Sequence, residues 1–113
     1  IMLPFRRRLT LDQRRHEFAR VQHYERVPLI LERGSRETPA IDKEKFLVPR
    51  DLTVGQLTFV VRKRLKLDAT RTIFLLVSNQ LLTSTTTIAS IYDRHRDEDG
   101  FLYVTYTFEN AFG

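Results

Sequence analysis

The stretch KEKFLVPRDLTVGQLTFVVRKRLK, residues 43–66, decides the fold of this 113-residue chain. Its first part alternates in polarity as a strand does when one face is covered. Phe46 and Val48 fall on one face, and Lys45 and Leu47 fall on the other. A proline follows directly, and because proline lacks a backbone donor it is expected to end the strand.

A helix is predicted to begin immediately after this strand. Thr53 is placed as the N-cap and Gln56 closes a capping box, while Leu52 and Leu57 match a hydrophobic staple. Apolar residues then recur at helical spacing on one face, namely Val54, Leu57, Val61 and Leu65. Basic residues occupy much of the remaining surface, so we expect the helix to pack its apolar face on a sheet.

Strand and turn patterns extend outward from this centre. We predict strands over 26–32, 72–78, 81–82 and 101–107, a turn at 79–80 and a short helix over 88–95. Before them, a capping box at Thr10 and Gln13 predicts a basic surface helix from Asp12 to about Gln22. The order of elements predicts an α+β domain, the β-grasp arrangement of one principal helix across a mixed sheet.

The net charge of +5 is concentrated at the start of the chain. Residues 1–26 hold seven arginines against three carboxylates, which is +4 of that total. Residues 1–25 are therefore predicted to form a basic helical extension that packs on a domain formed by residues 26–113. The chain has no cysteine, which excludes disulfides and thiolate chemistry and favours the cytoplasm. No apolar run approaches the roughly 20 residues that span a bilayer.

Catalytic and metal-binding patterns are missing from the sequence. Its three histidines match no HExxH pattern and accompany no nucleophile elbow or P-loop. The acidic cluster at 93–99 has the wrong spacing for a calcium loop and is typical of a solvated turn. We therefore predict no enzyme activity, catalytic residue, metal or cofactor.

Residues 43–66 closely resemble the autophagy ubiquitin-like modifiers, the family of the GABA-receptor-associated protein and the microtubule-associated protein light chains. Further matches are ERVPLILE at 25–32, IFLLVSN at 73–79, IYDRHRDEDGFLYVTY at 91–106 and the final Phe112 and Gly113. The resemblance implies a ubiquitin-like β-grasp fold preceded by N-terminal helices.

The resemblance also implies a conjugation tail that ends in Gly113. In this family the terminal glycine is prepared by a processing cysteine protease and passed between activating and conjugating enzymes. It is then joined to phosphatidylethanolamine, which places the lipidated protein on the autophagosomal membrane. A glycine suits this chemistry because it has no side chain to obstruct a narrow enzyme channel.

A second implied activity is the capture of acidic aromatic-x-x-aliphatic motifs carried by cargo receptors and adaptors. By resemblance, the aromatic pocket involves Pro28, Leu47 and Phe101, with Lys43 and Lys45 at its rim. The aliphatic pocket is implied to comprise Phe46, Val48, Pro49, Leu52, Leu57, Val60 and Val61. Arg26 and Arg64 are implied to pair with acidic residues of the motif.

Simpler interpretations stay open for several of these residues. Val48, Leu57, Val60 and Val61 would be apolar in any domain that packs this helix on its sheet. A lysine on an edge strand also protects against aggregation. Which of Phe18, Ala19 or Val21 lines the aromatic pocket is left open.

The N-terminal arginines suggest an alternative function. They could make the protein a basic adaptor that associates with the cytoskeleton or with nucleic acid and is not lipidated. Microtubule association is known for some members of the family. Specific nucleic-acid binding is not expected, because the interleaved aromatics and repeated modules of sequence-reading proteins are absent.

Overall fold

One mixed sheet forms the centre of the molecule in a computed structural model that describes residues 3–108. The strand order is β2-β1-β5-β3-β4, and β1 and β5 run parallel while the other neighbours run antiparallel. The strands are β1 (Arg26–Arg33), β2 (Lys45–Pro49), β3 (Ile73–Val77), β4 (Gln80–Leu81) and β5 (Leu102–Phe108). The predicted α+β, ubiquitin-like fold is thereby confirmed.

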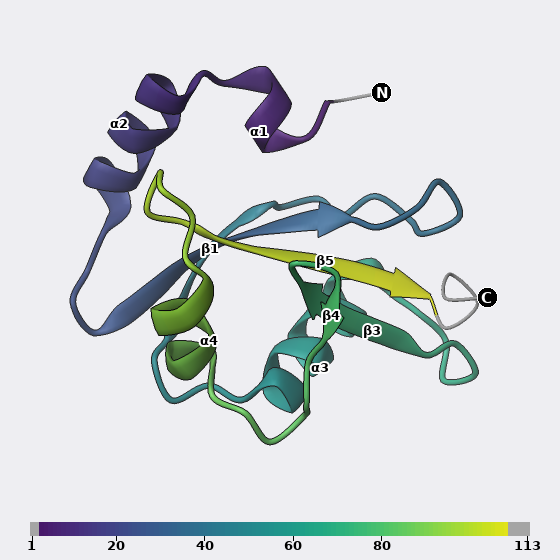
Figure 1. The fold of residues 1–113 in the computed structure, drawn as a ribbon. Coiled ribbons are helices and arrows are strands. Elements are labelled where there is room, and N and C mark those ends of the chain that lie inside the picture. Colours follow the sequence, from purple (N-terminus) through teal and green to yellow (C-terminus); the bar gives the residue numbers. More distant parts are fainter. Residues whose placement is uncertain (1–2, 109–113) are drawn as a thin grey trace.

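Helices cover both faces of this sheet (Figure 1). On one face lie α1 (Phe5–Arg8) and α2 (Leu11–Val21), and on the other lie α3 (Val54–Leu65) and α4 (Ile88–His95). The larger core lies on the α3 side, where alternate residues of β1, β3 and β5 pack against α3 and α4. Burial of these side chains is the main source of stability.

The predicted start of α3 is confirmed in detail. Thr53 is the N-cap, its side chain accepts from the backbone N–H of Gln56, and the Gln56 side chain completes the capping box. Two further N–H groups of this helix end, from Val54 and Gly55, donate to backbone carbonyls of the loop that precedes α4. The loop therefore satisfies helix donors that would otherwise need water.

The turn between β3 and β4 differs from the prediction by one residue. Ser78 and Asn79 both adopt positive φ, 51° and 63°, so they form the two-residue hairpin turn and Gln80 belongs to β4. The sequence pattern placed the turn at 79–80 and the strand at 81–82. Asparagine tolerates this backbone conformation more readily than serine. The predicted turn therefore began at Asn79, one residue too late.

A second, smaller core holds α1 and α2 on the sheet. Phe5, Ile30, Phe101 and Tyr103 are buried together, and Phe18 of α2 packs against them. The Phe101 ring meets the rings of Phe5 and Phe18 edge to face at centroid distances of 5.5 and 5.8 Å. Such pairs each contribute about 1 kcal/mol beyond the area they bury. The four-residue helix α1 had no capping signal in the sequence and depends on this burial.

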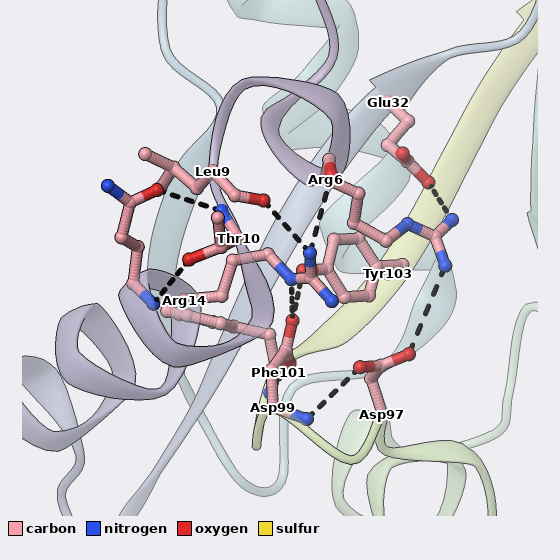
Figure 2. Close-up of polar contacts among 10 residues, drawn as sticks. Arg6, Leu9, Thr10, Arg14, Glu32, Asp97, Asp99, Phe101 and Tyr103 are labelled. Atoms are coloured by element: carbon pink, nitrogen blue, oxygen red, sulfur yellow. Dashed lines mark hydrogen bonds and ion pairs between the residues drawn. The ribbon is translucent and has the colours of Figure 1, made fainter.

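A buried carboxylate, Asp99, joins α2 to the start of β5 (Figure 2). Arg14 donates from Nε to Asp99 Oδ2 at 2.8 Å, and the Phe101 N–H donates to Asp99 Oδ1 at 2.8 Å. The Tyr103 hydroxyl also hydrogen-bonds to Asp99. Burial, together with that bond, raises the pKa of Tyr103 far above its ordinary value, so the phenol stays protonated. Asp99 therefore carries a charge that is fully partnered inside the protein.

Asp99→Ala is expected to lower the free energy of unfolding by about 3 kcal/mol, because it leaves the partly buried Arg14 charge without a carboxylate partner. Urea denaturation measures this change. Asp93→Ala is the matched control, since the Asp93 pair with Arg50 is exposed and should contribute less than about 1 kcal/mol. Equal effects of the two substitutions would contradict the role given to Asp99.

Candidate functional site

The outer edge of β2 is the feature that sets up the site. Within residues 3–108 β2 pairs only with β1, so its other side is open to a further strand. Leu47 lies opposite Pro28, which has no N–H to donate, so this is a non-hydrogen-bonded pair. The N–H and C=O of Leu47, and by the two-residue period those of Lys45, therefore point outward from β1.

Lys45 and Leu47 turn their side chains to the α2 face of the sheet. Leu47 is 38% exposed, whereas its partner Pro28 is buried. Lys45 Nζ donates to Glu17 Oε1 of α2 at 2.8 Å, and this bond lowers the pKa of the Glu17 carboxyl. The ion pair spans the space between β2 and α2. Both partners are partly solvated, so an acidic ligand can compete for Lys45 at small cost.

Phe101, implied to belong to the aromatic pocket, is fully buried beneath α1 and α2. Of the three α2 residues left open above, Phe18 and Val21 pack toward Phe101 and Ala19 is exposed. Phe18 and Val21 are thus the residues that can shape this pocket. Phe101 forms the floor of this pocket, and a ligand cannot reach its ring while α2 covers it.

Phe18 is fitted to the turn that precedes β5. Gly100 has φ of +100°, and a Cβ placed there would come within 2.5 Å of the Phe18 ring. A side chain at position 100 would therefore displace Phe18 and with it α2. The absence of a side chain at Gly100 is what lets α2 lie this close to the sheet.

The residues implied for the aliphatic pocket separate into two groups, and all but Pro49, which shares the face of Leu47 in β2, belong to the α3 side. Phe46, Val48, Leu57 and Val61 are buried and mainly build the core. Pro49, Leu52 and Val60 remain partly or largely accessible. Leu52 and Val60 also line a groove of about 520 Å³ together with Gln56 and the exposed Phe59. This groove offers an apolar surface directly beside the end of β2.

Three basic side chains flank the β2 edge. Lys43 Nζ lies 4.8 Å from the Phe46 ring centroid, which places Lys43 nearer to the implied aliphatic pocket than to the aromatic one. Arg64 lies 5.7 Å from the same ring and pairs with exposed Asp42 at 3.1 Å. Arg26 donates to the outward-facing Leu47 carbonyl at 3.5 Å. These weak surface contacts leave the cations able to exchange partners.

Sequence reasoning missed Glu17 and Asp99. Glu17 and Val21 are four residues apart and share one face of α2, so their spacing could have marked Glu17 as facing the domain. Asp99 offered no such signal, because it lies in a run of acidic residues that resembles a solvated turn. Only the fold brings Arg14 to it.

A mixed sheet crossed by α3, with a free β2 edge and helices capping the opposite face, defines a ubiquitin-like protein. The chain matches the family described as "Autophagy protein Atg8 ubiquitin like" over residues 6–113, and it belongs to that family. It is thus a member of a family of ubiquitin-like autophagy proteins.

Relatives of known name agree with this assignment. The chain is 50% identical over 106 residues to "Autophagy-related protein 8c" of Arabidopsis thaliana, covering 91% of this chain and 89% of the relative. It is 46% identical over 112 residues to "Autophagy-related protein 8" of Kluyveromyces lactis, covering 96% and 90%. The structure titled "Crystal Structure of Trypanosoma brucei ATG8" superposes with a TM-score of 0.87 at 38% identity, covering 96% of this chain and 97% of that chain.

Gly113 lies outside the described residues, so its position relative to β5 is not part of the site geometry. Across residues 3–108, every helix is too short or too polar to cross a bilayer. The site that the structure describes is therefore the β2 edge with its two flanking faces.

Gly100→Ala is expected to destabilise the protein by more than about 1 kcal/mol, because alanine disfavours this backbone conformation and its methyl group strikes Phe18. Combining it with Phe18→Ala should cost less than the sum of the two single changes, with a coupling of about 1 kcal/mol. A thermal or urea double-mutant cycle measures the coupling. Strict additivity would show that Phe18 does not rest on Gly100.

Proposed function

We propose that this protein is a ubiquitin-like modifier that is conjugated through Gly113 to phosphatidylethanolamine on autophagosomal membranes. There it recruits cargo receptors and adaptors that carry acidic aromatic-x-x-aliphatic motifs. Before conjugation it resides in the cytoplasm. It serves as a substrate of the processing protease and of the activating and conjugating enzymes, and it performs no catalysis of its own.

The observation that carries the recruiting role is the arrangement of two faces around the β2 edge. A peptide that adds to this edge as a strand turns successive side chains to opposite faces of the sheet. Its aromatic and aliphatic residues are three positions apart, so one points to the α2 face and the other to the α3 face. Leu47 borders the first face, and Leu52 and Val60 border the second. The motif spacing therefore suits this edge.

Charge supports a preference for acidic motifs. Lys45 holds Glu17 through a partly solvated ion pair, and Arg64 holds Asp42 through an exposed one. A carboxylate of the ligand can replace either internal partner without leaving a buried charge behind. Arg26 can meet a third acidic residue beside the Leu47 carbonyl.

The N-terminal arginines give the alternative adaptor function less support than the sequence suggested. Arg6, Arg8, Arg14 and Arg20 pair with Glu32, Glu44, Asp99 and Glu17. The first three of these pairs hold α1 and α2 on the domain, whereas Arg20 and Glu17 pair within α2. Arg7 and Arg15 are exposed and enter no ion pair within residues 3–108, which leaves a small charge for microtubules or nucleic acid.

Leu47→Ala is expected to weaken binding of a fluorescent acidic Trp-x-x-Leu peptide about tenfold, through loss of apolar contact at the α2 face. Lys45→Glu should weaken it at least as much, because it places a like charge before the acidic ligand. Fluorescence polarisation gives the affinities. Leu81→Ala is the control, since Leu81 is 57% exposed on β4 at the far edge of the sheet. Unchanged affinity in both β2 variants would show that the peptide binds elsewhere on the protein.

Gly113→Ala is expected to abolish formation of the lipid-linked product in a reaction with matched activating and conjugating enzymes and phosphatidylethanolamine vesicles. The added methyl group obstructs attack on the activated carboxyl, while the fold should be unaffected. A mobility shift on gels reports the product, and circular dichroism checks the fold. Lipidation of the variant at the normal rate would refute the conjugation role.

A further inference from the structure

A second groove lies at the C-terminal end of α2 and adjoins the β2-edge site. It has a volume of about 490 Å³ and is formed where the end of α2, the start of β1 and the end of α4 meet. Its floor is apolar and its lining includes Phe18, Pro28 and Tyr92. The groove shares Phe18 and Pro28 with the surroundings of the aromatic pocket, and its Arg26 also reaches the Leu47 carbonyl at the β2 edge.

Three arginines from separate elements surround this floor. Arg26 comes from the start of β1, Arg50 follows β2 directly, and Arg96 caps the end of α4. No aspartate or glutamate is among the residues that line the groove. Arg50 reaches exposed Asp93 only at 3.4 Å, and Arg26 and Arg96 take part in no ion pair within residues 3–108. The groove thus presents positive charge that the described part of the chain leaves almost uncompensated.

Aromatic side chains are also concentrated here. Tyr24 is 85% exposed and stacks on His23 at a centroid distance of 5.1 Å and an interplanar angle of 11°. Arg96 lies 5.6 Å from the ring of Tyr92, whose hydroxyl donates to the Gly100 carbonyl at 2.7 Å. Arginine and tyrosine are the residue types most enriched where protein partners bind strongly.

The apolar floor and the ring of arginines together restrict the kinds of ligand that the groove can bind. A simple anion such as phosphate would leave the apolar floor unused, and an uncharged apolar ligand would desolvate three guanidinium groups without pairing them. A peptide with one bulky apolar side chain flanked by carboxylates satisfies both. Each guanidinium can take a carboxylate with two parallel hydrogen bonds.

We propose that this groove, lined by Phe18, Tyr24, Arg26, Arg50, Tyr92 and Arg96, binds an acidic peptide segment of a partner protein that inserts a bulky apolar side chain between Phe18 and Tyr92. The segment differs from the motif at the β2 edge, because it needs neither strand pairing nor an aliphatic residue three positions on. The two sites adjoin and have Arg26 in common.

The test uses an acidic nonapeptide with one central phenylalanine and no aliphatic residue, titrated into the isotope-labelled full chain carrying Leu47→Ala. This background weakens β2-edge binding and the probe lacks the aliphatic residue that the β2-edge motif needs, so failure here is separate from failure of the recruiting role above. Chemical-shift changes are expected at the amides of residues 22–26 and 93–97. Replacing the phenylalanine of the probe by alanine, or its acidic residues by their amides, should abolish those changes.

Charge reversal distinguishes binding in the groove from nonspecific electrostatic attraction to a basic surface. Arg50→Glu with Arg96→Glu should weaken the nonapeptide at least about tenfold. Arg94→Glu is the control, because Arg94 is exposed on the same helix and does not line the groove, and it should change affinity less than about twofold.

Three results would overturn the proposal. They are the absence of shift changes at residues 22–26 and 93–97, an equal loss of affinity in the Arg94→Glu control, and tighter binding of an eight-residue oligouridylate at the same amides. The last would assign the groove to nucleic acid.

Discussion

The ion pair between Arg14 and Asp99 fixes the position of α2, on which the rest of the recognition surface depends. Asp99 is buried and accepts hydrogen bonds from Arg14, Phe101 and Tyr103 (Figure 2). A carboxylate in this place would be costly without all of its donors. α2 must therefore lie where Arg14 can reach Asp99. Because residues three and four apart share a helix face, this also turns Glu17 and Phe18 toward the domain.

Two adjoining sites beside α2 then acquire different chemistry from the same helix. At one site Glu17 meets Lys45 of β2, beside a strand edge whose backbone groups are free to pair. At the other site Phe18 rests on Gly100 and forms part of an apolar floor ringed by arginines. One site suits a ligand that adds a strand, and the other suits a ligand that inserts a single side chain. The sheet beneath supplies rigidity to both through the larger core on the α3 side.

Much of the fold could be predicted because its signals are local. The capping boxes at Thr10 and Thr53, the alternation in β2 and the bounds of α4 depend on residues within a few positions of each other, and all are found as expected. The β3–β4 turn was displaced by one residue because backbone preference at Ser78 and Asn79 is a weak signal. The contacts at Asp99 and Gly100 lie between residues about 80 positions apart, and no local pattern reports them. For the site, resemblance supplied the residue set, and the fold then separated accessible residues such as Leu47 from buried ones such as Leu57.

The central claim is that the outward backbone groups of β2 receive a partner strand. Hydrogen exchange of the Leu47 and Lys45 amides, followed by NMR with and without an acidic Trp-x-x-Leu peptide, tests it directly. Both N–H groups face away from β1 and should exchange quickly in the free protein, then become strongly protected when the peptide is bound. If the peptide binds while both amides still exchange quickly, the ligand does not pair with β2 and the account of the site is wrong.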